Sequence, residues 1–554
     1  MPETAVRPRR LDDVIARLER KQITRSLLLA DGSAWSDDPA EQREISGWLG
    51  WLPVVAQMQA QVDDLEAFAR QVRQDGVETV VLLGMGGSSL APIVLYAVFG
   101  SAKGSPHLLV IDTTDPEAIR HADERIDPNS SLFIVSSKSG GTIEPNVLAD
   151  YFWQRSAEQG DRFVAITDAD TSLATLAAER GFRRTFINRA DIGGRYSALS
   201  YFGLVPAALI GVDLRDLLTS ARDAVVSLEN ETARDNDAVE LGAQLGAFAN
   251  EGRDKVTFVA SPELRTLGLW LEQLLAESTG KQGRGLVPVA GEELGEPSVY
   301  SDDRVFVALE LDGLPLQDAA RLHKLSDAGH PVITRRLGDP YNLGAEFVSW
   351  EIATAVAGAV LGVNPFDQPN VQESKDNTTR VLDELAQTGR LPALSTPISH
   401  GSLTLHGLEP AEAVEGLRAM FRAAAPGGYF AFMAYLAETA TRQLKLDRLR
   451  LLVRDNTRLA TTFGYGPRFL HSTGQLHKGG PPVGSFIQLR RTLARDLEIP
   501  GHDFTFGQLQ EAQALGDLQA LQSRGLPVLA VDLGEDVDKG LEEFTLLCRD
   551  ALNS

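Results

Sequence analysis

The chain has 554 residues, of which 43% are apolar and 23% charged, a composition typical of a globular protein with two or three packed domains. Its formal net charge is -23, from 53 basic and 76 acidic residues, which argues against nucleic acids and anionic membranes as partners. With a single cysteine, Cys548, no disulfide within the chain is possible, which fits a reducing compartment such as the cytoplasm. We expect Cys548 to be a small buried hydrophobe.

The N-terminus carries no apolar stretch after its basic residues, so no secretory signal is expected. Residues 11–75 show apolar positions at helical spacing and predict a helical N-terminal arm, residues 1–75. The longest apolar run, residues 196–212, is interrupted by serines, a glycine and a proline. It is short for a membrane span and predicts a buried helix.

From residue 77 onward, apolar strand-like runs alternate with helix-like segments. The runs at 77–87, 107–113, 131–137 and 162–168 predict a doubly wound parallel sheet, in a first α/β domain of residues 76–235. Similar runs at 255–262, 304–312 and 330–337 predict a second domain of the same architecture, residues 236–375. We interpret the polar, helical stretch 223–253 as a connector between the two.

The remaining residues, 376–554, predict an additional C-terminal α/β region. It holds a predicted helical tract at 412–446, two short apolar runs at 447–453 and 485–489, and a strand-like run at 527–534. We find no tandem repeat of short period and no low-complexity tract.

Two glycine-rich loops each lie between a predicted strand and a predicted helix: GMGGSS at 84–89 and SSKSGGTIEP at 136–145. Glycines let backbone N–H groups point at an anion, and the helix that follows adds the positive end of its dipole. Neither loop has a nucleotide-binding spacing. Both are compatible with simple tight turns, but the hydroxyls and the lysine of the second loop favour a phosphate site.

The loop SSKSGGTIEP (136–145) is similar to the phosphate-binding loop of sugar isomerase (SIS) domains. Three further segments are IGGRYSALS (192–200), EQLLAESTGK (272–281) and NPFDQPNVQESK (364–375). They resemble motifs of the phosphoglucose isomerase family, with Gln372 standing where the family pattern has glutamate. The resemblance implies two SIS domains and interconversion of glucose 6-phosphate and fructose 6-phosphate.

One departure concerns the histidine motif, which the family places between the glutamate and lysine motifs. No such segment lies between Glu277 and Lys375, whereas LHSTGQLHKGG (470–480) is similar to it and comes later. The region after residue 376 resembles the isomerase half of transaldolase–isomerase fusions. The order of motifs therefore indicates a divergent branch with a relocated histidine.

The chemistry of an aldose–ketose isomerase assigns roles to the matched residues. One carboxylate must move a proton between C2 and C1, and we assign this role to Glu277. Arg195 supplies fixed positive charge for the enediolate oxygen. By resemblance His471 opens the ring, with Lys375 near the ring oxygen, and His477 is the competing histidine.

The phosphate end of the substrate has its own candidate residues: Gly87, Ser88, Ser137, Lys138 (chiefly through its backbone), Ser139 and Thr142. Gln273 and Gln368 are candidate donors to the substrate, or structural residues. No metal or nucleotide cofactor is implied, since the histidines lack metal-ligand spacing and the reaction moves a proton. The resemblance implies a homodimer. Family members take the catalytic histidine from the partner subunit, but because the histidine segment is moved in this chain, the subunit in which it acts stays open.

Two alternatives stay open. The loop reads Ser-Gly-Gly-Thr where many family members have Ser-Gly-Thr-Thr, so the six-position group of the sugar could be a sulfonate, as in sulfoquinovose. Mannose 6-phosphate is another possible substrate. The second alternative is a sensor module of the SIS type that binds sugar phosphates without turning them over, although Glu277 and Arg195 in their motifs favour an enzyme.

Overall fold

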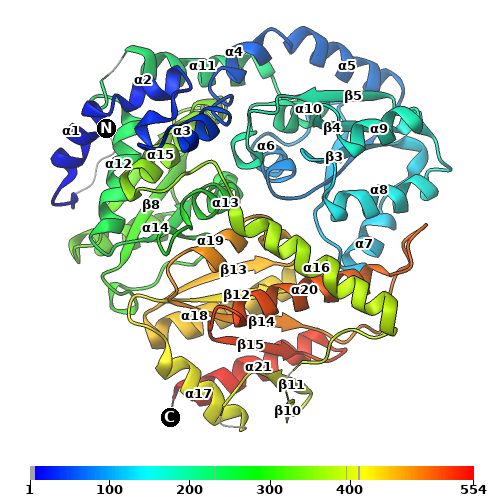
Figure 1. The fold of residues 1–554 in the computed structure, drawn as a ribbon, viewed down its shortest axis with the longest axis vertical. Helices are drawn as coiled ribbons and strands as arrows, with labels where there is room; N and C mark the ends of the chain where they lie inside the picture. Colours follow the sequence, from blue (N-terminus) through cyan, green and yellow to red (C-terminus); the bar gives the residue numbers. More distant parts are fainter. Residues whose placement is uncertain (1–5, 231, 395, 410–411, 554) are drawn as a thin grey trace.

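The computed structural model describes residues 6–230, 232–394, 396–409 and 412–553 (Figure 1). Within these residues the strands form three separate sheets, each with helices packed against it. In Figure 1 the first and second sheets lie side by side in the upper half of the molecule and the third lies below both. The expected fold class, two parallel-sheet SIS-type units with a helical arm and a further C-terminal α/β region, is confirmed.

The N-terminal arm is helical, as predicted, but its described residues are broken into short helices. Their bounds are α1 Leu11–Arg20, α2 Ile23–Leu28, α3 Pro39–Ser46, α4 Val54–Gln59 and α5 Val62–Gln74. In α1 the buried residues Leu11, Ile15 and Leu18 recur at helical spacing, which is why this segment forms an amphipathic helix. The indole Nε1 of Trp35 donates to the carbonyl of Ala355 at 2.8 Å and so ties the arm to the second unit.

The first sheet has the order β2-β1-β3-β4-β5, with all of these strands parallel. Its strands are β1 Thr79–Gly84, β2 His107–Ile111, β3 Ser131–Ser136, β4 Phe163–Asp168 and β5 Arg184–Asn188, and its helices are α6 Leu90–Phe99, α7 Pro116–Asp123, α8 Ile143–Arg155, α9 Ser172–Glu179 and α10 Tyr201–Ile210. Four of these strands match the predicted runs. The edge strand β5 was missed, because only two of its five residues are buried.

The strand order of this sheet reverses between β1 and β3. Gly84, at the end of β1, pairs with Ser136, at the end of β3, so the two glycine-rich loops leave the sheet next to each other. This is the switch point at which open α/β sheets bind their ligands. The apolar run 196–212 contains α10, which is buried along nearly its whole length, as predicted.

The second sheet is also parallel, with the order β7-β6-β8-β9. Its elements are β6 Lys255–Ala260, β7 Val287–Val289, β8 Arg304–Leu311, β9 Val332–Leu337, α11 Leu214–Asn230, α12 Asp237–Asn250, α13 Leu267–Thr279, α14 Leu316–Asp327 and α15 Leu343–Leu361. The interpretation of 223–253 as a polar connector is wrong for α12. That helix is buried along most of its length and packs against α15, because Gly242 and Gly246 allow the two helices to approach closely.

The third sheet has the order β10-β11-β15-β14-β12-β13, in which the pairs β10–β11 and β11–β15 are antiparallel and the others parallel. Its elements are α16 Pro369–Thr388, β10 Ile398–His400, β11 Leu403–His406, α17 Ala413–Ala423, β12 Tyr429–Ala434, α18 Ala440–Thr457, β13 Ala460–Tyr465, α19 Gly474–Gly479, β14 Gly484–Arg490, α20 Phe506–Gln522, β15 Val528–Asp532 and α21 Val537–Leu552. Cys548 in α21 is buried and unpaired, as expected.

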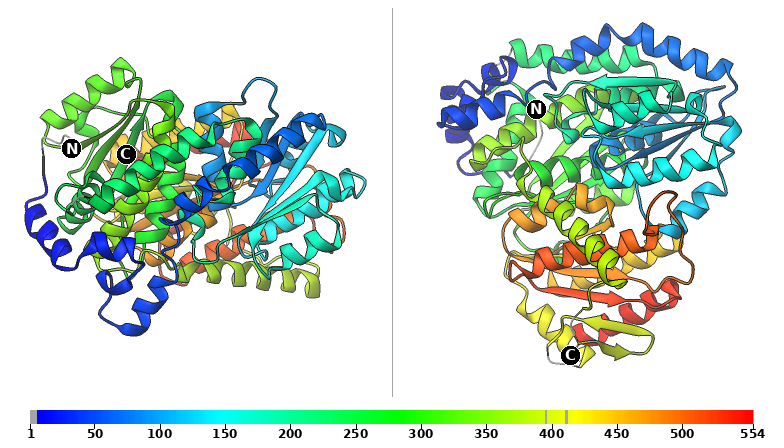
Figure 2. Two further views of the ribbon diagram at one scale, coloured as in Figure 1. Left: turned by 90° about the horizontal axis from the view of Figure 1, so that it is seen from above. Right: turned by 45° about the vertical axis from the view of Figure 1, so that its right-hand side comes forward.

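The prediction of a helical tract at 412–446 is wrong for the middle of that segment. Residues 429–434 form β12, a central and fully buried strand of the third sheet, while the apolar run 447–453 belongs to α18. A short run that is buried on both faces has no alternation of polar and apolar residues, so periodicity alone does not separate strand from helix. In Figure 2 the long helix α16 crosses the junction between the third sheet and the two others.

One helical stretch of the described residues, Pro340–Leu361, is long and apolar enough to cross a membrane. In this structure most of that stretch is buried inside the protein, where α15 packs against α11, α12 and α13. The division of the chain at residues 75, 235 and 375 stays a prediction.

Candidate active site

The loop that carries Arg195 packs directly on the first glycine-rich loop. A side chain at Gly87 would overlap the carbonyl of Gly194, so the two backbones approach each other more closely than any other residue type permits. Gly86 has a positive φ of 54°, and a Cβ there would lie 2.7 Å from the carbonyl oxygen of His471. The glycines of the first loop therefore bring three segments of the chain together.

Arg195 is almost fully buried, with 1% of its surface exposed. Its guanidinium donates to the hydroxyl of Ser278 at 2.7 Å, to Gln368 Oε1 at 2.9 Å and to the carbonyls of Pro365 and Asp367 at 2.6 and 2.9 Å. Its Nη1 lies 3.2 Å from Glu277 Oε1. A buried charge with all of these partners keeps a fixed position, which suits the stabilisation of a developing oxyanion.

Glu277 lies in the last turns of α13, with Gln273 one turn before it. The amide Nε2 of Gln273 donates both to Glu277 Oε2 at 3.0 Å and to the carbonyl of His471 at 2.8 Å. A single side chain thus links the candidate base to the segment with the candidate histidine. Gln273 and Gln368 both contact the candidate catalytic groups, Gln368 by accepting from Arg195.

Lys281, at the end of the same motif, holds the loop that faces Arg195. Its Nζ donates to the carbonyls of Asn364 and Asp367. Burial, followed by the charge of Arg195, lowers the pKa of Lys281 to about 7. Arg195 and Lys281 therefore bind the same stretch of backbone, and they position Gln368 at its end.

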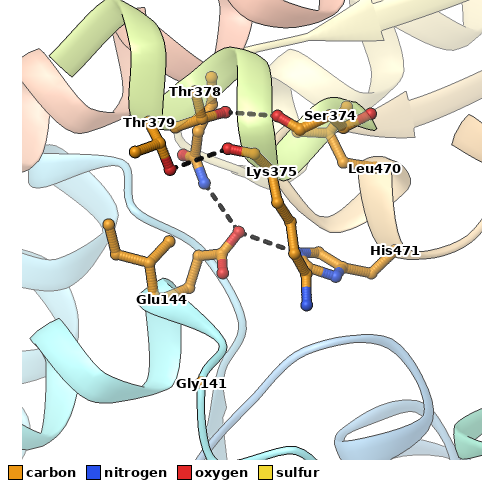
Figure 3. Close-up of a pocket in the computed structure, with 10 residues that line it drawn as sticks. Gly141, Glu144, Ser374, Lys375, Thr378, Thr379, Leu470 and His471 are labelled. Carbon is orange, nitrogen blue, oxygen red and sulfur yellow. Dashed lines mark hydrogen bonds and ion pairs between the residues drawn. The ribbon is translucent and has the colours of Figure 1, made fainter. Parts of the chain in front are cut away.

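His471 ends a short 3-10 helix, η9 Arg468–His471, in the C-terminal region. Its Nε2 lies 2.8 Å from Glu144 Oε1 (Figure 3). Gln513 Nε2 donates to the same oxygen at 2.7 Å. Thr114 in turn donates to Gln513 at 2.8 Å. Burial raises the pKa of Glu144, but the attraction and hydrogen bond of His471, with a contribution from Lys375, outweigh it and leave this pKa below its ordinary value.

Sequence reasoning missed Glu144 and Gln513. Glu144 lies in the first turn of α8, where an acidic residue is common because it faces the positive end of the helix dipole, so its sequence context gave no functional signal. Gln513 lies in the middle of α20 and is far in sequence from every motif described above.

Lys375 projects from α16 into the same pocket as His471 and Glu144 (Figure 3). This pocket, with a volume of about 90 Å³, also borders Gly141 of the second glycine-rich loop. Gln372, where the family pattern has glutamate, is exposed and donates to Asp376 at 2.7 Å.

His477, the competing histidine, lies in a different environment. It is buried among Tyr429, Phe469 and Phe486, and neither ring nitrogen has a hydrogen-bond partner among the described residues. Burial, with the nearby charge of Lys478, lowers its pKa to about 3. His477 is therefore a neutral core residue, whereas His471 faces the pocket.

The second glycine-rich loop presents several unused donors. The hydroxyl of Ser137 is buried and has no partner among the described residues, and α8 begins at Ile143 without a side-chain cap from Thr142. Ser139 is exposed and accepts from the N–H of Gly141 at 3.3 Å. These groups and the N-terminus of α8 form a suitable cradle for an anion.

Two other candidate residues of the loops, Lys138 and Ser88, already have hydrogen-bond partners within the protein. The ammonium of Lys138 pairs with Asp168 and donates to the carbonyl of Ala190 at 3.1 Å, so its side chain supports the end of β4. The carbonyl of Ser88 accepts from the hydroxyl of Ser136 at 3.2 Å, which joins the two loops.

Comparison with known proteins gives a consistent result. The family model for phosphoglucose isomerase matches residues 52–287. The chain is 31% identical over 360 residues to glucose-6-phosphate isomerase of Rubrobacter xylanophilus, covering 55% of this chain and 83% of that protein. It is 28% identical over 393 residues to glucose-6-phosphate isomerase of Exiguobacterium sibiricum, covering 61% of this chain and 87% of that protein.

Solved structures agree at the level of the fold. A glucose-6-phosphate isomerase from Chlamydia trachomatis superposes with a TM-score of 0.56 and 20% identity, covering 69% of this chain and 87% of that chain. A hypothetical protein from Thermus thermophilus also gives a TM-score of 0.56, with 26% identity, covering 69% of this chain and 100% of the other. With the sequence relatives, these findings show that the chain belongs to the phosphoglucose isomerase family.

Proposed function

We propose that this protein interconverts glucose 6-phosphate and fructose 6-phosphate by ring opening followed by proton transfer through a cis-enediol. The observation that carries the proposal is the convergence of Glu277, Arg195 and the His471 segment through Gln273. The relatives of the chain that bear the name glucose-6-phosphate isomerase support the same reaction.

Each group has a role in this proposal. Glu277 moves the proton between C2 and C1, because its carboxylate is held between Arg195 and Gln273. Arg195 stabilises the enediolate oxygen with its fixed charge. His471, oriented by Glu144, transfers the proton that opens the ring, and Lys375 faces the ring oxygen.

The phosphate is held by the second glycine-rich loop in this proposal. Ser137, Ser139 and Thr142 offer hydroxyls, and the first turn of α8 offers N–H groups. Gly87 and Ser88 border the loop from the neighbouring strand end. Lys138 contributes through its position in the loop backbone, since its ammonium is paired with Asp168.

In this proposal the chain supplies its own histidine to the site. Glu144, Glu277, Lys375 and His471 all come from a single chain, and His471 lies 2.8 Å from Glu144 within it. We infer that His471 acts in the active site of its own subunit. A homodimer and a cytoplasmic location remain predictions.

The test is turnover of fructose 6-phosphate, coupled through glucose-6-phosphate dehydrogenase to NADP reduction, with EDTA present. Glu277→Gln is expected to lower kcat by about 10²–10⁴-fold, because the amide cannot accept the proton. Glu296→Gln, at an exposed glutamate paired with Lys324, is the matched control and should retain full activity. Equal activity of E277Q and the unmodified protein would contradict the assignment of Glu277 as the group that moves the proton.

A sulfonate sugar is the second candidate substrate. Gly141 stands where many relatives have threonine, and nothing lies within 4 Å of the place a side chain would take. The missing hydroxyl thus leaves open space beside the anion site. We expect a comparison of kcat/KM for fructose 6-phosphate and the sulfonate analogue to favour the phosphate, and the reverse preference would reassign the substrate.

A further inference from the structure

A second cavity lies where the three units of the chain meet. Its volume is about 230 Å³, and its lining includes Leu90, Leu269, Glu272, Arg450, Arg468 and Phe469. We call it the junction cavity. Leu90 comes from α6, Leu269 and Glu272 from α13, and the others from the C-terminal region. It shares no lining residue with the pocket at His471.

Glu272 is the unusual group of this cavity. Only 5% of its surface is exposed, and its carboxyl group makes no hydrogen bond or ion pair with any residue that the structure describes. Burial, opposed by the charges of Arg450 and Arg468, raises its pKa to about 8. At neutral pH this side chain is therefore mainly a carboxylic acid, whose O–H can donate a hydrogen bond to a molecule in the cavity.

The charged groups that face Glu272 are mainly positive. Arg450 donates to the carbonyls of Ala290 and Thr461, and the carboxylate that pairs with it, Asp447, is 3.9 Å away. Arg265 and Arg468 also line the cavity, as does Glu438, which pairs with Arg468 at 2.8 Å. Asp112, outside the lining, also pairs with Arg468 at 3.6 Å. Among the lining residues themselves, three arginines stand against the carboxylate of Glu438.

Most of the remaining surface of the cavity is apolar and includes Leu90, Leu269, Phe463 and Phe469, with a few uncharged polar side chains such as Thr266 and Gln443. A cavity of this kind, apolar with a few convergent polar groups, is the usual form of a small-molecule site. The arginines would repel a cation, whereas they would attract an anion, which could also accept a hydrogen bond from the protonated Glu272.

We propose that the junction cavity binds a small carboxylate with an apolar body, which accepts a hydrogen bond from Glu272 and faces Arg450 and Arg468. The two sites share backbone segments: Glu272 precedes Gln273, which binds Glu277 and the carbonyl of His471, and Ser472 of the cavity wall follows His471. The occupant therefore contacts the segments that hold the candidate catalytic groups.

The test is calorimetric titration of the full chain with benzoate at pH 7. A saturating equilibrium mixture of glucose 6-phosphate and fructose 6-phosphate is present, so that the phosphate loop is occupied. We expect one benzoate per chain. Glu272→Gln, which keeps a donor, should bind within about threefold of the unmodified protein, whereas Glu272→Leu and Leu269→Trp should bind at least tenfold more weakly.

Raising the pH from 7 to 9 should weaken benzoate binding to the unmodified protein about tenfold, because Glu272 then loses its proton and repels the carboxylate. E272Q should show no such loss. Thermal unfolding of each variant verifies that it is folded.

Four results would overturn the proposal: no binding, displacement of benzoate by the sugar phosphates, unchanged binding in both E272L and L269W, or a preference for benzylamine that E272Q abolishes. Calorimetry reads binding and not turnover. The result therefore stands apart from the outcome of the isomerase assay.

Discussion

Glu144 is a buried carboxylate whose partners explain its ionisation. His471 lies 2.8 Å from it and Gln513 donates to the same oxygen. Because its pKa in the folded protein is below the ordinary value, the carboxylate stabilises the fold above the ordinary glutamate pKa of about 4.3. This stability is lost as the pH falls through the lowered pKa.

Glu144→Gln is therefore expected to cost about 1.5–3 kcal/mol of unfolding free energy at pH 7, the typical value of a hydrogen bond to a charged group. The difference from the unmodified protein should shrink as the pH falls below about 4.3. Urea unfolding at pH 7 and at pH 3.5 measures both values. A cost that is constant with pH would contradict the assigned role of the carboxylate charge.

The same variant tests whether Glu144 positions His471. We expect kcat to fall by about tenfold or more with KM nearly unchanged, because the amide holds the imidazole less firmly and lacks the charge. Glu144→Asp keeps the charge and should recover part of kcat. A purely structural role would predict no such recovery.

The two histidines of the 470–480 segment make a matched pair. His471→Ala should lower turnover of the ring form of fructose 6-phosphate by about 10²-fold or more, since ring opening loses its proton carrier. His477→Leu should stay within a few-fold of the unmodified protein, because His477 packs in an aromatic core. The coupled assay reads both, and a reversal of the two results would exchange the assignments.

At the scale of the elements, the site depends on contacts between turns. The turn after β1 packs against the turn that carries Arg195, and the C-terminal segment with His471 packs against the first of these turns. Glycine at 87 is required because the opposing carbonyl of Gly194 leaves no room for a side chain. Gly141, in the second loop, faces open space instead.

These two glycines give a prediction with an internal control. Gly87→Ala should cost about 1–3 kcal/mol of unfolding free energy, typical of overpacking, and should lower kcat because Arg195 is displaced. Gly141→Ala should change stability by less than about 0.5 kcal/mol. Chemical denaturation and the coupled assay together measure both variants, and equal effects would mean that the close packing at Gly87 is unimportant.

At the scale of the whole molecule, the C-terminal region places His471 beside Glu144 of the first α/β unit in the same chain. The third sheet lies below the two others in Figure 1, and its unit delivers His471 to the switch point of the first sheet. Contacts across this junction include the ion pair of Arg442 with Glu117 at 3.1 Å. The proposal that each active site is built from one chain rests on this arrangement.

Mixing two inactive variants tests that confinement. If each site is built from one chain, co-expressed E277Q and H471A should show no more activity than either variant alone. A site shared between subunits would give mixed dimers with one intact site, and activity would return. Size-exclusion chromatography of the mixture verifies whether mixed dimers form.

The sequence by itself determined the parallel strands, the glycine-rich loops and the identity of Glu277, Arg195 and Lys375 as candidates. Strand runs such as 131–136 are mainly apolar and lead into loops rich in serine and glycine, so local pattern is sufficient to find them. The motifs are short and continuous in the chain, which makes them visible without a structure.

Only the tertiary structure decided the rest. It separated His471 from His477, because the difference is between a pocket and an aromatic core formed by residues distant in sequence. It revealed Glu144 and Gln513, which meet across 369 positions of the chain. It also showed that residues 429–434 form a strand. A run that is buried on both faces takes its conformation from the neighbouring strands and not from its own periodicity.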